Sequence, residues 1–333
     1  MREPPRGVDP AHLATVLRER WGLVGSLHHL PVGFGSHHWR LAPGSGGDAG
    51  SGSGDEPAVF VTVDELGHRP FLGPDAEGAL AALVMAAAAV HALSAGGLDQ
   101  AVAPLPSAEG SLVVALDADH AVWVHPWVTG TSGDFGEHLD DRRRTALLDV
   151  LAQLHATVVR VPLRRAPLFA ERAQLLRLLD VSTRADDVED HWPALAHQWL
   201  REHREELLAA VMALAEAEQR AASGDAVVTH GEPHPGNVMW TADGLRLIDW
   251  DTVALAPRER DVWLAATDDG DVEQYERASG ARLDRRLLQA YDDAWQLSDA
   301  ASYADELVRA VDRREDDADL VLAWRILQDW SAR

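Results

Sequence analysis

The segment 226–251, AVVTHGEPHPGNVMWTADGLRLIDWD, is the feature that most constrains how this chain folds. Two short apolar runs flank residues 242–244, a pattern that predicts two strands around a tight turn. Pro233 and Pro235 exclude a helix in the first half of the segment. Because long helical patterns lie on both sides, we expect a small strand-rich island that carries polar side chains.

The N-terminal third differs in pattern from the rest of the chain. Asp9 and Pro10 predict the start of a helix, and alternating apolar residues then predict strands near 23–32, 39–42 and 58–63. A helix over 75–94 and a hairpin that turns at 117–120 follow. Apolar spacing after that predicts long helices over 140–159, 167–179, 191–221, 282–297 and 300–330. We therefore predict an α+β fold with a small β-rich N-lobe (1–125), a hinge (126–130) and a larger helical C-lobe (131–333).

Composition limits the partners and the chemistry. A net charge of −24 repels nucleic acid and anionic membranes and favours cationic partners, although solubility alone would also explain it. The longest apolar run, near 79–93, is rich in alanine and interrupted by His91, which favours a packed helix over a membrane span. The polar opening of the chain does not resemble a secretory signal, and the lack of cysteine excludes disulfides and Cys-ligated zinc. A cytoplasmic protein, monomeric or dimeric, fits these features.

The sequence contains no lysine, so all 30 basic residues are arginines. Lysine chemistry is therefore excluded, both a Schiff base and a lysine that holds nucleotide phosphates.

Six polar residues of the island have the types that phosphoryl transfer requires. The reaction needs a carboxylate that orients or deprotonates the attacking hydroxyl, and oxygen ligands for the magnesium that bridges nucleotide phosphates. HGEPHPGN and LIDWD supply His230, Glu232, His234, Asn237, Asp249 and Asp251. The two histidines are four residues apart with a glutamate between them, but the prolines forbid the helix that a zinc HExxH site needs.

HGEPHPGNVMW followed by LIDWDTVALAPRERD resembles the core of the aminoglycoside phosphotransferase and choline kinase family, and the second run is especially similar to the spectinomycin phosphotransferase branch. This resemblance implies a bilobal protein-kinase-like fold, with ATP or GTP and Mg²⁺, and a cationic aminoglycoside, aminocyclitol, amino sugar or choline-like substrate. Inactivation of an antibiotic is one role that it suggests. It implies a catalytic loop (228–239) and a metal-binding strand end (247–251). Within them, the resemblance makes Glu232 the base and Asn237 and Asp249 metal ligands, with Asp251 near the metal and His230 and Asp261 supporting the loop.

The resemblance also implies a nucleotide site on the N-lobe. GFGSHH follows one predicted strand and precedes another, so Gly33, Gly35, Ser36 and His37 suit a flap over phosphates, with an ordinary hairpin turn as the alternative. Arg40, Thr62, His125 and Trp127 complete the expected nucleotide-binding set.

Two positions depart from the family pattern. Thr62 stands where the family has a lysine, and Arg40, His37 and His38 are the candidate substitutes. Glu232 replaces the usual aspartate, which extends the carboxylate by about 1.5 Å, and a misplacement near 1 Å can cost roughly a hundredfold in rate. These departures leave three hypotheses open: an active kinase, a degenerate member that binds ligand without efficient transfer, and a related transferase with altered chemistry.

Substrate contacts are expected from acidic and aromatic residues of the helical lobe. Carboxylates and tryptophan faces both bind ammonium groups, and the candidates are Asp268, Asp269, Asp292 and Trp263. Acidic helix faces are commonly only solvated, and tryptophans at helical spacing commonly belong to a core.

The insertion 44–56, GSGGDAGSGSGDE, lies between two predicted strands and is too poor in apolar residues to order itself. We predict that a short turn can replace it with little change in melting temperature or in any activity. Thermal unfolding of the shortened chain measures this, and a large loss of stability or activity would show that the segment has an ordered role.

Overall fold

The computed structural model describes residues 7–33, 36–43, 58–67, 72–73, 75–185 and 188–330. The insertion 44–56 and Gly35 lie outside the described residues. The chain forms two compact units, one made of residues 1–164, 227–255 and 268–279, and the other of 165–226, 256–267 and 280–333. The first unit thus holds both the N-terminal sheet and the island with the catalytic motif. The exact lobe boundaries given above stay a prediction.

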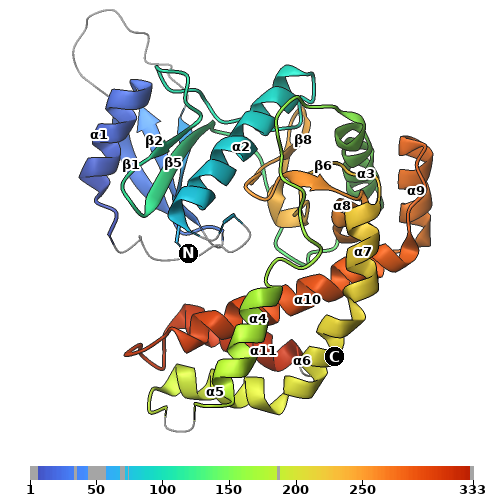
Figure 1. Ribbon diagram of the computed structural model, residues 1–333. Coiled ribbons are helices and arrows are strands. Elements are labelled where there is room, and N and C mark those ends of the chain that lie inside the picture. Colours follow the sequence, from blue (N-terminus) through green and yellow to red (C-terminus); the bar gives the residue numbers. More distant parts are fainter. Residues whose placement is uncertain are drawn as a thin grey trace, which may run out of the picture. The chain divides into compact units, whose positions relative to one another are not determined.

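A five-stranded antiparallel sheet forms the N-terminal part of the first unit (Figure 1). Its strands, β1 (Gly25–Leu30), β2 (Ser36–Pro43), β3 (Val59–Glu65), β4 (Val113–Ala115) and β5 (His120–Pro126), lie in the order β1-β2-β3-β5-β4. The predicted strands and the predicted hairpin at 117–120 are therefore confirmed. Because side chains alternate between the faces of a strand, the sheet presents one face to α1 (Pro10–Trp21) and the other to α2 (Ala76–Ala95).

The two faces bury different residues. On one face, Leu13 and Leu17 of α1 pack against Val61 and its apolar neighbours. On the other, Leu83 of α2 packs with Trp123 of β5. Among the described residues, α2 is the one helix that is long and apolar enough to cross a membrane, a weak indication that core helices also give. Its buried positions within this cluster identify it as the expected packed helix.

Short strands hold the island. These are β6 (Val227–Thr229), which pairs with β9 (Ala254–Ala256), and the hairpin of β7 (Val238–Thr241) and β8 (Gly244–Leu247). The linker after β5 is bonded to this hairpin, since the Thr131 and Trp240 backbones exchange N–H···O bonds of 3.0 and 2.8 Å. The backbones approach so closely that a Cβ on Gly130 would lie 2.5 Å from the Trp240 carbonyl oxygen. This position therefore requires glycine.

Helix α3 (Asp141–Ala156) completes the first unit together with α9 (Asp269–Ser279). Arg144 Nε donates to Asp271 Oδ1 at 2.8 Å, and a 2.6 Å hydrogen bond joins His155 Nδ1 to Tyr275 Oη in the buried contact between the helices. Sequence patterning did not predict α9, because it buries few apolar side chains.

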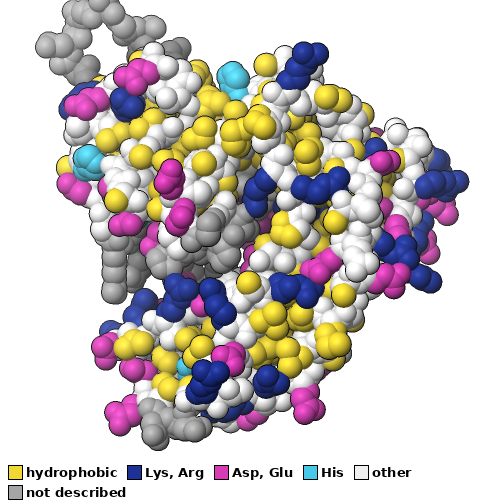
Figure 2. Space-filling model, viewed as in Figure 1, with side chains coloured by type: hydrophobic (Ala, Val, Ile, Leu, Met, Phe, Trp, Pro, Cys, Tyr) yellow, Lys and Arg dark blue, Asp and Glu magenta, His cyan; other side chains and the backbone are white. Residues whose placement is uncertain are grey.

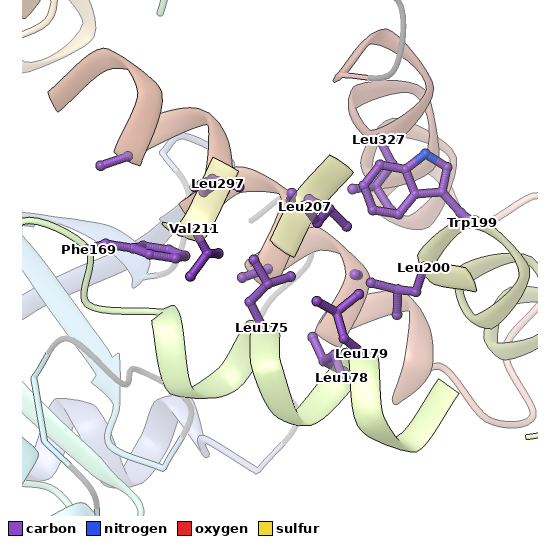
Figure 3. Packing of buried hydrophobic residues seen from close by; sticks show 14 of the residues in the cluster. Phe169, Leu175, Leu178, Leu179, Trp199, Leu200, Leu207, Val211, Leu297 and Leu327 are labelled. Carbon is purple, nitrogen blue, oxygen red and sulfur yellow. The ribbon is translucent and has the colours of Figure 1, made fainter. Parts of the chain in front are cut away.

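The second unit is helical and has one large core (Figure 3). Leu175 and Leu179 of α4 (Arg172–Ser182), Trp199 of α5 (His191–Glu202) and Leu327 of α11 (Ala318–Trp330) meet in it. The remaining helices are α6 (Arg204–Ala213), α7 (Ala215–Ser223), α8 (Glu259–Ala265) and α10 (Arg285–Val308).

Helix boundaries in the second unit differ from the sequence prediction. The helix expected over 191–221 is three helices that change direction near His203 and Leu214. The break expected between 297 and 300 does not occur, because α10 runs unbroken and buries Leu297, Ala300 and Ala301 on one face. The short helix α8 was also not predicted. The spacing of apolar residues indicates which face of a helix is buried. It does not indicate where one helix ends and the next begins, because that depends on packing against other helices.

Gly130→Ala is predicted to destabilise the protein, because the added methyl group overlaps the Trp240 carbonyl and forces the linker off the hairpin. Overpacking of this kind costs about 1–3 kcal/mol of unfolding free energy. Chemical denaturation measures the loss. The control is Gly67→Ala, where a Cβ has no heavy atom within 4 Å, and equal effects of the two substitutions would contradict the packing argument.

Candidate active site

His230 lies at the base of the catalytic loop and is fully buried. Its Nε2 donates to the Ile248 carbonyl at 2.9 Å, and its Nδ1 accepts the Glu232 backbone N–H at 3.3 Å. A neutral ring with its proton on Nε2 satisfies both contacts. The side chain therefore ties the start of the loop to the residue that precedes Asp249, a positioning role rather than a chemical one.

The loop after His230 folds back through the 3-10 turn η1 (Pro235–Asn237). Asn237 is buried, and its Nδ2 donates to the Glu232 carbonyl at 3.0 Å and lies 3.2 Å from His234 Nε2. Both hydrogen bonds that the Asn237 side chain makes with described residues use Nδ2, so its Oδ1 is available to a cation. The Glu232 side chain is half-buried on the same loop.

The β7–β8 hairpin brings Asp249 beside Asn237. Val238 pairs with Leu247, and the Ile248 N–H donates to the Asn237 carbonyl at 3.1 Å, so Asp249 follows directly on the strand end opposite Asn237. Asp249 has a φ of 61°, one of two positive values among described non-glycine residues. Such a conformation costs of the order of 1 kcal/mol for an L-residue, and retained strain of this kind is typical of functional positions.

Residues 250–254 hold the loop from the other side. The Trp250 ring is buried 4.4 Å from the His230 ring, and its Nε1 donates to the Leu247 carbonyl at 2.9 Å. Thr252 Oγ1 donates to the His230 carbonyl at 2.9 Å. Asp251, which lies between Trp250 and Thr252 in the sequence, is also buried. Sequence reasoning missed Trp250 and Thr252. Trp250 lies within the LIDWD motif and Thr252 directly follows it, and these positions were the only sequence signal for their role.

Asn237 and Asp249 supply hard oxygen donors, which is the ligand chemistry that Mg²⁺ prefers. Among the described residues no group of three or more His, Asp or Glu side chains could hold a metal. Two protein ligands fit a magnesium ion that takes its other ligands from phosphates and water.

The β3 position expected to carry lysine is part of a buried polar pair. Thr62 Oγ1 lies 3.3 Å from His38 Nδ1, and both side chains are buried on the α2 face of the sheet. Two residues along, Ser36 Oγ donates to the buried Asp64 carboxylate at 2.8 Å. His37 instead faces the other side, where its ring lies 6.3 Å from Trp39. The structure therefore brings His38, and not His37, to Thr62.

Aromatic rings occupy the hinge end of the same face. Phe60 lies 4.9 Å from His38 and 6.3 Å from Trp127, and the guanidinium of Arg40 lies 5.0 Å from the Trp127 ring centre. Burial lowers the pKa of His125 to about 4, so this ring is neutral at pH 7 and is not a substitute for the lysine. Phe60 escaped sequence reasoning because it looked like an ordinary strand residue.

The predicted substrate residues belong to different helices and to the segments that flank them. Asp268 Oδ1 accepts the Asp271 N–H at 3.0 Å and so caps α9, where Asp269 is the first residue. In the second unit Trp263 packs at the edge of the core, 5.7 Å from Trp295, and Asp292 accepts hydrogen bonds from Gln289 and Gln296. Asp261 is fully buried in the first turn of α8. Trp263, Asp261 and Asp292 belong to the second unit, and Asp268 and Asp269 belong to the first.

The negative charge of the chain is spread over its surface. Figure 2 shows arginine and acidic side chains interspersed on the face in view. Many are paired at a spacing of four residues, as in Arg220 with Glu216 at 2.7 Å and Arg184 with Asp180 at 3.1 Å. Solvated pairs explain these acidic helix faces without a ligand.

Comparison with known proteins places the chain in a family. A sequence model described as the phosphotransferase enzyme family matches residues 51–304, so the chain belongs to that family. No curated protein matches the sequence.

Solved structures share the fold at low identity. Spectinomycin phosphotransferase in complex with ADP and spectinomycin is 16% identical, with a TM-score of 0.70 over 97% of this chain and 95% of that one. An amicoumacin kinase bound to AMP-PNP and Ca²⁺ is 14% identical, with a TM-score of 0.60 over 98% and 94%. A choline kinase from Streptococcus pneumoniae is 12% identical, with a TM-score of 0.56 over 97% and 100%. The kinase-like fold is thereby confirmed.

Asp249→Asn is predicted to keep the fold and to abolish magnesium-dependent nucleotide binding or turnover. Asparagine tolerates the left-handed backbone as aspartate does, but it removes the anionic ligand. Magnesium titration by calorimetry in the presence of nucleotide measures this. The matched control is Asp312→Asn, the other described non-glycine residue with positive φ (54°). Unchanged magnesium affinity in the Asp249 variant would refute the assignment.

Proposed function

We propose that this protein transfers the γ-phosphate of ATP or GTP to a hydroxyl group of a cationic small molecule. The observation that carries the proposal is the convergence of Glu232, Asn237 and Asp249 on one loop and one strand end, held by the His230 hydrogen bonds and by the β7–β8 register. Family membership supports a phosphotransferase. The small-molecule substrates in the names of the similar structures support an acceptor of that size.

In the proposed reaction the Glu232 carboxylate accepts the proton of the acceptor hydroxyl as its oxygen attacks the γ-phosphorus and the nucleoside diphosphate leaves. Oδ1 of Asn237 and the carboxylate of Asp249 would hold Mg²⁺, which neutralises phosphate charge when it is bound. His230 holds the start of the loop in place, and Asp261, to which the resemblance gives a supporting role, is buried. Misplacing the base lowers the transfer rate, so the hydrogen bonds that hold the loop contribute to the rate as well as to the stability of the fold.

The α2 face of the N-terminal sheet is the proposed nucleotide site. Phe60 and Trp127 offer aromatic surfaces for a base, and Arg40 stacks on Trp127 beside them. His125 Nδ1 is buried with no hydrogen-bond partner among the described residues, a state that costs about 1–3 kcal/mol and that a polar group of a ligand would relieve. Gly33 and Ser36 border this face, and Gly35 belongs to the proposed flap.

A second candidate function is a binding protein without efficient transfer. Thr62 favours it, since this position of β3 carries a hydroxyl group where the family pattern has a lysine. The deciding experiment incubates the protein with Mg²⁺, ATP or GTP, and spectinomycin, choline or ethanolamine, and measures substrate-dependent nucleotide consumption. Turnover supports the kinase. Nucleotide binding with no turnover across the acceptors supports the binding protein. A cytoplasmic location stays a prediction.

Glu232→Gln is predicted to keep the melting temperature and the nucleotide affinity while lowering the transfer rate by about 10²–10⁴-fold, the usual contribution of a general base. Glu232→Asp, the residue of the family pattern, should retain part of the activity or raise it. Steady-state kinetics on purified variants measures both. The matched control is Glu109→Gln, an exposed partner of Arg20 outside the proposed site. A glutamine variant that transfers phosphate as fast as the wild type would contradict the assignment of Glu232 as the base.

A further inference from the structure

Phe135 is an exposed aromatic residue at the tip of a tight turn beside the catalytic loop. Its side chain is 57% exposed, among the more open large apolar residues of the described chain. The Glu137 N–H donates to the Asp134 carbonyl at 3.1 Å, so Phe135 and Gly136 are the central residues of a β-turn. Gly136 has a φ of 78°, the left-handed conformation that this turn requires at its third position. The turn therefore presents the ring at a defined place.

The turn is bonded directly to the catalytic loop. The Gly133 N–H donates to the Pro235 carbonyl at 3.0 Å, and the Thr131–Trp240 pair anchors the same segment one step earlier. The Phe135 ring meets the His234 ring edge to face, with ring centres 5.0 Å apart. Since His234 is two residues from Glu232, the Phe135 ring lies against the loop that carries the proposed base.

The local charges suit a cation. The carboxylates that flank the turn, Asp134 and Glu137, lie on exposed residues. An exposed phenyl face attracts ammonium groups through its quadrupole and offers apolar surface to the carbons next to the nitrogen.

We propose that Phe135 binds the acceptor, contacting the ammonium-bearing part of a cationic substrate and so determining its specificity. This inference rests on the proposed function, because it assigns a residue to the acceptor side of that site. It adds a contact that no motif in the sequence indicates, from a turn that precedes the catalytic loop by about a hundred residues.

The test compares Phe135→Ala with Phe135→Trp and Phe135→Leu. Binding of choline, ethanolamine and spectinomycin is measured by calorimetry with Mg²⁺ and a non-hydrolysable ATP analogue, and transfer is measured with ATP. A cation–π contact of intermediate exposure corresponds to about a tenfold change in affinity. We expect the alanine variant to lose about tenfold in acceptor affinity and to raise the acceptor KM equally. Its kcat, nucleotide affinity and melting temperature should be unchanged.

The tryptophan variant should restore acceptor affinity and the leucine variant should restore it only in part, which separates an aromatic contact from apolar area. The control is Val158→Ala, another exposed apolar residue (88% exposed). Wild-type transfer with an unchanged acceptor KM in Phe135→Ala overturns this inference and leaves the proposed function standing. Wild-type protein that binds nucleotide but neither binds nor phosphorylates any of these cations counts against both.

Discussion

The geometry of the candidate active site depends on the backbone pairing of the β7–β8 hairpin. Its register places Asn237 and Ile248 opposite one another, and the bond from the Ile248 N–H to the Asn237 carbonyl extends that pairing beyond the strands. His230 uses the other group of the same residue, since its Nε2 donates to the Ile248 carbonyl. One residue of the strand end, Ile248, is thus bonded through its carbonyl to the start of the proposed catalytic loop and through its N–H to the end of that loop. A slip by one residue would turn every side chain of the strand to the other face and would separate the proposed ligands.

The same hairpin is also the anchor of the linker. The Thr131–Trp240 pair and the Gly133–Pro235 bond attach the segment after β5 to the hairpin and loop, so the sheet that carries Thr62 and the loop that carries Glu232 belong to one compact unit. Residues separated by more than a hundred positions are held by main-chain contacts that depend little on side-chain identity. This explains how a fold can be shared with structures that are only 12–16% identical.

Sequence reasoning succeeded where the pattern is local. Alternation gave the N-terminal strands, and the motif spacing placed Asn237 and Asp249 on neighbouring ends of one hairpin. It failed where the deciding contact is distant. The helix α9 buries only Val272 and Tyr275, so its local signal is weak, and it is held by Arg144 and His155 from α3. His37 and His38 are adjacent in sequence, and only the pairing of β2 with β3 shows that one of them faces Thr62. Phe135 has no motif at all, and its position depends on a turn bonded to a loop far along the chain.

The loss of lysine from the whole sequence changes how phosphate charge can be neutralised under the proposed function. Among the described residues, Arg40 is the basic side chain on the α2 face of the sheet. It stacks on Trp127 at the hinge end, near Phe60. At the position of Thr62 the structure holds a hydroxyl group that pairs with the imidazole of His38. The net charge of the chain is −24, so the field of the whole protein does not offset the negative charge of the phosphates. The charge on the phosphates must then be met mainly through the ion that Asn237 and Asp249 would hold, and by hydrogen bonds of the flap backbone. Asp249 would then be the carboxylate on which phosphate binding depends most. Its backbone has the strained positive φ that proteins commonly retain at functional positions.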